Sequence, residues 1–247
     1  MSDFVKRTRN SDRMSWPEGV RMRLERVGAD EELELGASHF FGFPDVPRGF
    51  DFPCTDDECD LAFVAQLRLR DVPARTRTAA HLPADGLLLF FADVDYCLGD
   101  ADADPPPTAL QPRDRVRVVL VPADQLAPGT LLRGTIVDAD GNPCCLPAHR
   151  VVFVERHNGG SNDEDEDEGA EAGAEEKHQL FGDPEDMPYE DYDADAAGFR
   201  LLLQVDSCEG PDFCAMFGDE GLYTFIIDPA ALARGDFSGV RGWLASS

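Results

Sequence analysis

LAFVAQL at residues 61–67 and FRLLLQV at residues 199–205 are two apolar stretches that each end in a glutamine followed by an aliphatic residue. Both are short and rich in Leu, Val and Phe, as is typical of buried β-strands. A glutamine on such a strand must satisfy the donors and the acceptor of its amide inside the protein. Each amide therefore either bonds to neighbouring backbone at the end of its strand or faces a cleft.

Two further landmarks accompany each stretch in the same order along the chain. Upstream, HFFGFPDVP at residues 39–47 resembles HQLFGDPEDMP at residues 178–188. Downstream, DGLLLFF at residues 85–91 resembles EGLYTFI at residues 220–226. Three landmarks in one order predict an internal repeat, with a first unit at about residues 36–100 and a second at residues 178–247. Gln66 should then superpose on Gln204, and Gly86 on Gly221.

The segments between the two units also favour β-structure. Strands are predicted at residues 115–121, 131–137 and 150–155, inside a middle region of about residues 110–157, and the alternation of Val20, Met22 and Leu24 predicts another. Helix signals are restricted to residues 228–235 and about 71–80. The prediction is a single domain over residues 1–247 of the α+β class, mainly antiparallel sheet with few short helices, in two related sheet units.

Packing of the two units against each other predicts one shared core. A lone hairpin is only marginally stable, so each unit should bury its apolar strands against the other. The residues expected in this core are Leu201, Leu202, Leu203, Phe225, Ile227, Phe63, Leu87, Leu89 and Phe91.

The net charge of −27 and the pI of about 4.3 argue against nucleic acid or an anionic membrane as partner, because both require cationic surface. Between Ser161 and Asp195 the chain has 16 acidic residues and one lysine. Its densest part, Asp163–Glu168, predicts a disordered acidic insertion at about residues 158–177. It is either a solvated loop or a segment that binds cations or docks a basic protein partner.

Seven cysteines with irregular spacing, and no readable export signal, predict reduced thiols and a cytoplasmic protein. Cys144 and Cys145 with His149 are the best metal candidate, although thiols that only pack at turn edges account for them more simply. The chain has no dinucleotide-binding, P-loop, zinc-protease or nucleophile-elbow motif. No cofactor and no resident metal are predicted, and the oligomeric state stays open.

The landmarks resemble those of the YwqG-like family of bacterial proteins, a domain family of unknown function. The matching stretches are FGFP at 41–44 with Pro47, FDFP at 50–53, FVAQL at 63–67, LP at 82–83, GLLLFF at 86–91, residues 178–188, LLQVDS at 202–207, FGDEGLYTFI at 217–226 and DFS at 236–238. The resemblance covers about residues 36–240, with the acidic insertion outside it.

The resemblance implies a compact, intracellular, mostly-β protein, and it brings no catalytic residue or cofactor. It also points to a link with toxin immunity, through the gene neighbourhoods of family members. This chain departs from the family pattern at one place: members often have an acid two residues after the first glutamine, where Arg68 stands here, while the second copy keeps Asp206 after Gln204. A symmetric pair of acids would therefore have lost one member.

Six residues are candidates for a cleft between the two units: Gln66, Gln204, His39, His178, Asp206 and Asp219. The amides could face one cleft, the imidazoles could act as acid–base groups, and the carboxylates could form a weak cation site. Each has a structural alternative, since buried amides clamp backbone and Asp caps turns. We name no catalytic residue.

The sequence thus favours a non-enzymatic protein-interaction module, with a link to toxin immunity, whose acidic surface meets a basic protein partner. The alternative is an enzyme, or a binder of a small ligand or divalent cation, with its site between the two repeat halves.

Overall fold

The computed structural model of the protein describes residues 16–28, 31–56, 61–93, 109–110, 113–137, 145–154, 177–184, 198–207, 215, 217 and 221–245. The acidic run Asp163–Glu168 lies outside the described residues, so the prediction of a disordered insertion is not addressed by the structure. None of the described helices is long and apolar enough to cross a membrane.

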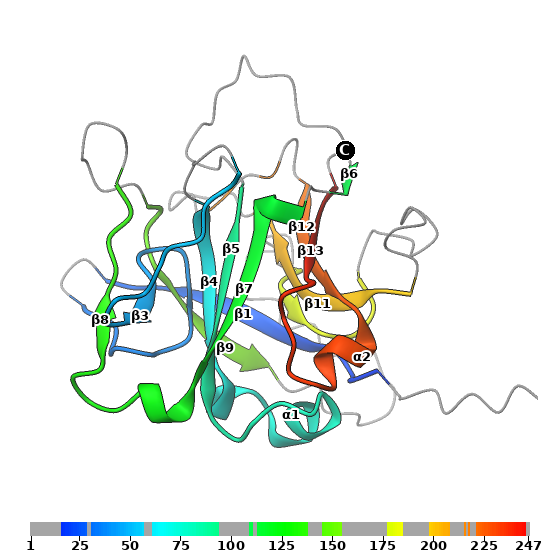
Figure 1. Ribbon diagram of the computed structural model, residues 1–247, viewed down its shortest axis with the longest axis horizontal. Coiled ribbons are helices and arrows are strands. Elements are labelled where there is room, and N and C mark those ends of the chain that lie inside the picture. The colour runs from blue at the N-terminus through cyan, green and yellow to red at the C-terminus, as the bar shows by residue number, and fades with distance from the viewer. Residues whose placement is uncertain are drawn as a thin grey trace, which may run out of the picture.

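Strands dominate the described chain (Figure 1). They are β1 (Val20–Arg26), β2 (His39–Phe40), β3 (Asp45–Pro47), β4 (Ala62–Arg68), β5 (Gly86–Ala92), β6 (Ala109–Leu110), β7 (Val116–Pro122), β8 (Leu131–Arg133), β9 (His149–Val154), β10 (Gln179–Leu180), β11 (Arg200–Asp206), β12 (Leu222–Ile227) and β13 (Arg241–Ala245). The helices are α1 (Ala74–Ala79) and α2 (Pro229–Leu232), with short 3-10 turns at Leu69–Asp71, Arg113–Arg115 and Ala123–Gln125.

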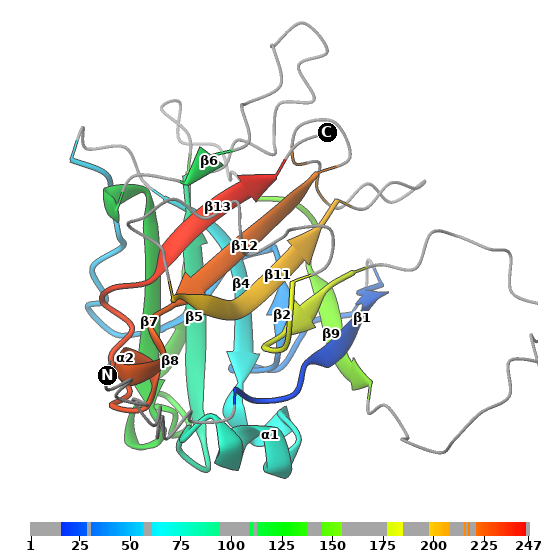
Figure 2. The same ribbon diagram turned by 90° about the vertical axis from the view of Figure 1, so that its right-hand side faces the viewer.

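One antiparallel sheet contains eleven of these strands, in the order β6-β13-β12-β11-β10-β1-β9-β2-β4-β5-β7. The sheet curls until it is nearly closed, which brings β13 beside β7 (Figures 1 and 2). At this seam a Cβ added to Gly242 of β13 would lie 2.6 Å from Cγ2 of Val116, at the start of β7. The ladder between β1 and β9 lies in the middle of the strand order.

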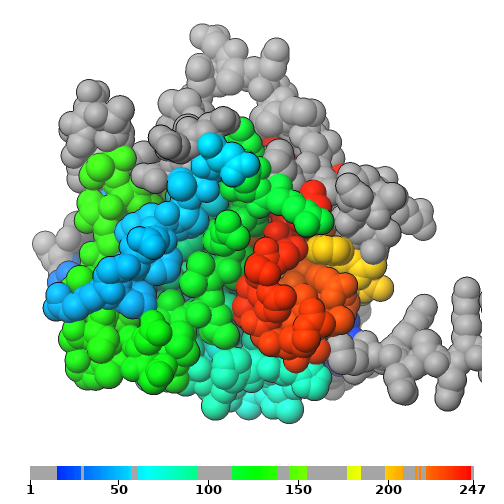
Figure 3. Space-filling model, viewed as in Figure 1, coloured from blue at the N-terminus to red at the C-terminus, as the bar shows by residue number. Residues whose placement is uncertain are grey.

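A second sheet of two strands, β3 and β8, covers the outer face of β4 and β5. Asp45 pairs with Arg133 and Pro47 with Leu131. In Figure 3 the blue segment around β3 and the green segment around β8 lie over the large sheet. Gln66 of β4 lies on the face of the large sheet that this cover overlies, and its amide bonds to Asp45 of β3.

The same strand pairing occurs on both sides of the large sheet. In β4 and β5, Gln66 lies opposite Leu89, and the register shifts between Phe63 and Ala65. In β11 and β12, Gln204 lies opposite Thr224, and the register shifts between Leu201 and Leu203. Both pairs therefore have a bulge at the same distance before the glutamine.

A left-handed Phe-Gly pair ends the short strand next to each glutamine strand. Phe41 and Gly42 have φ of 53° and 69°, and Phe181 and Gly182 have φ of 58° and 79°. Phenylalanine rarely adopts this backbone conformation, so the surroundings must hold it there. A backbone hydrogen bond helps to fix the first pair, from Phe41 N to Val64 O at 2.9 Å. The second has the corresponding bond, from Phe181 N to Leu202 O at 3.0 Å.

The apolar interior forms two clusters rather than the one shared core that the sequence predicted. The larger cluster fills the inside of the curled sheet and includes residues of both halves, with the rings of Phe90 and Phe225 5.1 Å apart. All nine predicted core residues are buried. However, Phe63, Leu87, Leu89 and Phe91 belong to a separate cluster on the outer face, beneath the β3–β8 cover. The central strands of the first half are thus covered on both faces.

The predicted α+β class is wrong, because the fold is mostly β. The two helices that the sequence indicated are present, but α1 has six residues and α2 has four. Each is a single short connection rather than a layer of the fold. The strand predicted at residues 131–137 is also shorter, since β8 ends at Arg133 where Gly134 N bonds to Pro44 O.

Gly221→Ala should destabilise the protein, because a Cβ there would lie 2.1 Å from Ala245 O and 2.3 Å from Phe217 O. Both atoms are backbone and cannot turn aside, so we expect a loss of about 1–3 kcal/mol in the free energy of unfolding. Urea unfolding measures it. Gly239→Ala is the matched control, since nothing lies within 4 Å of its added Cβ. Equal stability of the two variants would contradict the packing at Gly221.

Candidate functional site

Gln66 lies on the outer face of β4 and is fully buried. Its Oε1 accepts the backbone N–H of Asp45 at 2.8 Å, and its Nε2 donates to Ala37 O and to Asp45 Oδ2, each at 2.8 Å. The amide therefore uses both of its donor hydrogens and its acceptor inside the protein. Its partners all belong to the segment that runs across the strand from residue 37 to residue 45.

Asp45 is a fully buried carboxylate that joins three segments of the first half. Its Oδ2 also accepts the N–H of Gly36 at 2.8 Å, and its Oδ1 accepts Nε of Arg133 at 2.8 Å. Arg133 further donates to Leu33 O at 3.1 Å. A buried charge is tolerated only when it is paired and hydrogen-bonded, and here both conditions are met. The carboxylate thus fastens β8 and the loop before β2 onto β4.

His39 lies beside Gln66 across the β2–β4 ladder, and it is buried. Its Nδ1 is 2.8 Å from Phe41 O, so Nδ1 is the protonated nitrogen that donates, and the ring meets Phe63 edge-on. Burial lowers the pKa of His39 to about 4, although the charge of Asp45 acts in the opposite direction. The imidazole is therefore neutral at physiological pH and holds the left-handed Phe-Gly turn.

His178, Gln204 and Asp206 come together in the second half. Nε2 of Gln204 donates to Lys177 O at 2.9 Å, and the N–H of Asp206 donates to Nδ1 of His178 at 3.0 Å. Oδ2 of Asp206 accepts the N–H of Lys177 at 2.9 Å. Burial lowers the pKa of His178 to about 3, and the nearby charges of His149 and Arg21 add to that effect. This imidazole is neutral as well.

The strand registers place the second histidine one residue away from the position that the sequence comparison suggested. His39 lies opposite Gln66, whereas Gln179 lies opposite Gln204. The residue that corresponds to His178 is Ser38, whose Oγ accepts the N–H of Arg68 at 2.8 Å. A hydroxyl and an imidazole thus accept equivalent backbone donors in the two halves.

Arg68, the departure from the family pattern, has a partner of its own. Its Nε and Nη2 donate to the two carboxylate oxygens of Asp85, at 2.6 Å and 2.8 Å. Asp85 in turn accepts the N–H of Gly86 at 2.8 Å. The Arg68 guanidinium holds the pKa of the Asp85 carboxyl below its usual range. Arg68 therefore secures the turn that leads into β5.

Five of the six candidate residues fall into two groups. Gln66 and His39 belong to the cluster around Asp45, and His178, Gln204 and Asp206 belong to the cluster around Lys177. Four strands, β2, β9, β1 and β10, lie between β4 and β11 in the sheet. Asp219 lies outside the described residues. Cys144 of the metal candidate lies outside them too, and Nδ1 of His149 is 3.0 Å from Pro147 O.

Sequence reasoning missed Asp45 and Arg133 as members of the first cluster. Asp45 stands inside the HFFGFPDVP landmark, so an acid in that tight segment was a visible signal. Its cationic partner is 88 residues further along the chain. Only the pairing of β3 with β8 brings the two together.

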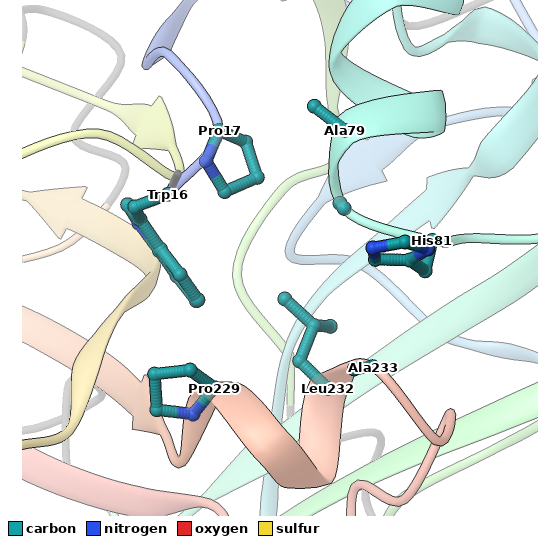
Figure 4. Close-up of a pocket in the computed structure, with 8 residues that line it drawn as sticks. Trp16, Pro17, Ala79, His81, Pro229, Leu232 and Ala233 are labelled. Carbon is teal, nitrogen blue, oxygen red and sulfur yellow. The ribbon is translucent and has the colours of Figure 1, made fainter. Parts of the chain in front are cut away.

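One small hollow, with a cavity volume of about 10 Å³, lies at the surface between α1, α2 and the residues before β1. Trp16 projects into it from the residues before β1, Pro229 and Leu232 project from α2, and His81 stands at its edge (Figure 4). Its lining is almost entirely apolar and includes none of the six candidates. Ligand pockets are usually larger, at about 300–1,000 Å³. Within the described part of the chain, no group of three or more His, Cys, Asp or Glu is placed to hold a metal ion.

These features define a mostly-β domain built on one large, nearly closed antiparallel sheet, with buried amide and imidazole clusters on two sides. The chain belongs to the family described as Domain of unknown function (DUF1963), whose sequence model matches residues 38–245. No curated protein matches the sequence. The matched range begins at the residue before β2, so strand β1 lies outside it.

Stability should fall between pH 7 and pH 5 because of His39 and His178. Their pKa values in the folded protein, about 4 and about 3, lie below the value of about 6.5 for an unfolded histidine. In this window the unfolded state binds more protons, so acidification favours unfolding. We expect a loss of roughly 2 kcal/mol for each histidine, measured by urea unfolding at each pH.

The control for this effect is the double variant His39→Gln with His178→Ser, which installs the residue found at the corresponding position of the other half. Its free energy of unfolding should depend much less on pH than that of the wild type. His81→Asn, at an exposed position, should leave the pH dependence unchanged. A double variant as acid-sensitive as the wild type would show that other groups cause the effect.

Gln66→Ala should cost about 2–5 kcal/mol of stability, because it leaves the N–H of Asp45, the carbonyl of Ala37 and one carboxylate oxygen short of a partner. Thermal and urea unfolding measure the loss. Gln125→Ala is the matched control, since Gln125 is exposed and its backbone carbonyl, which the substitution leaves in place, accepts a hydrogen bond from Thr130 Oγ1. A loss below about 1 kcal/mol at Gln66 would mean that water replaces the amide.

Proposed function

We propose that the protein is a non-enzymatic interaction module that binds a basic protein partner. The observation that carries this proposal is the use of the candidate side chains within the fold itself. Gln66, Gln204, His39 and His178 are each buried to 1% exposure or less. Each is bonded to the protein's own backbone. These side chains stabilise the fold, so we infer that the surface of the protein is the part that binds a partner.

The surface has the property that such a role requires. A net charge of −27 on 247 residues attracts cationic molecules and speeds their encounter. Large apolar side chains are also exposed at Leu35, Leu132, Val137 and Val154. An interface that combines steering by charge with apolar contact is typical of specific protein complexes.

We extend this proposal to a role in toxin immunity, which the same chemistry supports. Enzymes that act on nucleic acids carry cationic surface, because they must bind phosphate backbones. An acidic protein that covers this surface blocks the enzyme by competing with its substrate. We propose that such a basic enzyme is the partner of this chain. We also propose that the YwqG-like family of the sequence resemblance and the DUF1963 family are the same.

The alternative function, an enzyme or a small-ligand or cation site between the halves, is favoured by one contact. Asp206 and His178 are joined by a hydrogen bond of 3.0 Å. However, that bond uses the backbone N–H of Asp206 and the lone pair of Nδ1, and the low pKa of His178 keeps the ring neutral. A catalytic role would require this bond to break first.

We further propose that the halves are two copies of one unit, as the repeated landmarks predict. Support comes from the matched registers of β4–β5 and β11–β12, with bulges at corresponding places. It also comes from the left-handed Phe-Gly pair in each half. We propose a cytoplasmic location, since Cys54 is an exposed, free thiol and a reducing compartment preserves such thiols.

The test is capture from a lysate of the native cell on immobilised full-length chain. We expect a small set of basic proteins retained at about 50 mM salt and released by about 300 mM, because salt screens the attraction. Mass spectrometry identifies them. Retention of no protein at low salt, or only of acidic proteins that salt does not release, would sink the proposal.

A charge-matched variant locates the binding surface. Replacing the six acids of Asp163–Glu168 by their amides removes six charges without changing side-chain size. Loss of affinity on the order of tenfold or more assigns binding to the acidic run, whereas unchanged affinity assigns it to the folded domain. In either case the salt sensitivity of the wild type must persist.

A further inference from the structure

Strand β1 occupies a slot between two strands that come much later in the chain. On one side it forms a six-residue ladder with β9, from Arg21 opposite Val154 to Arg26 opposite His149. On the other side it pairs with β10, and Met22 N donates to His178 O at 3.0 Å. Val20 and Met22 point into the core and are buried. Without β1, no strand links β9 to β10 and the large sheet is divided into two parts.

β1 and β2 follow each other in the chain but are not neighbours in the sheet. Residues 27–38 connect β1 to β2, and β9 lies between these strands in the sheet. Both β1 and β2 run antiparallel to β9. β1 is thus tethered to the first half of the chain while it pairs with strands that follow residue 148.

The other half makes the reciprocal arrangement. β9 directly precedes β10 in the described order of strands, yet it pairs with β2 and β1. His149 of β9 lies opposite Phe40 of β2, and Val20 of β1 lies opposite Leu180 of β10. Each half of the chain therefore gives its leading strand to the other half.

We propose that β1 is an exchangeable strand, and that the slot between β9 and β10 accepts β1 from a second copy of this chain. The contacts in the exchanged dimer are those already present in the monomer, so exchange creates no new interface at the slot. The choice between the two states then depends on the tether. A strand held by its own chain has a high effective concentration, and a second copy competes only when the protein is concentrated.

Charge favours the entry of this strand into a second molecule. β1 carries three arginines, at positions 21, 23 and 26, and one acid, Glu25, while the whole chain has a net charge of −27. A cationic strand is attracted to a second molecule of this net charge, which offsets part of the repulsion between two copies. Salt at physiological strength weakens the remaining long-range repulsion. The inference depends on the pairing of β1 and holds whether or not the protein binds a basic partner.

The experiment uses full-length chain that carries both Arg23→Cys and Val152→Cys. This double variant is prepared in two versions that differ only in their tag. These two positions lie opposite each other in the β1–β9 ladder. Residues directly opposite in an antiparallel ladder have Cα atoms about 4.5–5.5 Å apart, within the range of a disulfide. Arg23 is exposed and Val152 is half-buried, so neither substitution should prevent folding. The two proteins are unfolded, mixed, refolded at about 10 μM or about 1 mM, and then oxidised.

We expect a disulfide within one chain at the lower concentration. At the higher concentration we expect covalent dimers that carry both tags, in which mass spectrometry finds the cross-linked peptide that joins positions 23 and 152. Single variants, which retain the native cysteines, must not give this peptide. An intrachain disulfide with no interchain product at any concentration would overturn the exchange, and the absence of both products would overturn the β1–β9 pairing.

A second measurement does not depend on engineered cysteines. Wild-type chain is refolded with an excess of a fluorescent peptide of residues 16–28, and uptake is read by anisotropy after gel filtration. A peptide with Met22→Asp, which places a charge at a buried position, should bind on the order of a hundredfold more weakly. A peptide with Arg23→Ser, altered at an exposed position, should bind within a few fold of the wild type. Equal uptake of all three, or of none, argues against the slot.

Discussion

A glutamine amide on an apolar strand has two donor hydrogens and one acceptor that water cannot reach, and the loops of this protein are shaped by that constraint. Gln66 takes its partners from the backbone at residues 37 and 45, and Gln204 takes one at residue 177. Because the chain must pass close to each amide, it turns sharply just beyond, through a left-handed Phe-Gly pair. In the first half Asp45 extends the same network to Arg133, which fixes the two-stranded cover.

The sequence predicted those parts of the fold that depend on local pattern. The apolar strands at β4, β5, β11 and β12 stand out by their composition, and α2 by its Asp228 cap, which accepts the N–H of Ala231. Pairings between distant segments were not readable. Nothing near Val20 indicates that its strand lies between β9 and β10, and nothing near Asp45 points to Arg133. The sequence also did not reveal that His39 and His178 occupy positions one residue apart in the two halves. Ser38 and His178 are the equivalent residues, and each accepts the backbone N–H that follows two residues after the glutamine.

That equivalence bears on how a candidate site is recognised. Histidine, glutamine and acids near one another in a sequence suggest catalysis, but here they hold loops to a sheet. The decisive measure is accessibility: His39 and His178 are buried, and burial lowers the pKa of each far below the neutral range. The amides and imidazoles are thus inside the molecule, together with the Asp45 carboxylate that Arg133 neutralises.

The curled sheet has two junctions between its halves, one between β1 and β9 and the other between β7 and β13. They differ in the kind of contact that holds them. β1 and β9 are joined by a continuous backbone ladder. Across the described residues of β7 and β13, by contrast, no ladder is formed and side chains such as Val116 make the contact. Thermal fluctuations break side-chain contacts more readily than a row of backbone hydrogen bonds. Local opening of the sheet is therefore expected to begin where β7 meets β13, while the ladder between β1 and β9 stays intact.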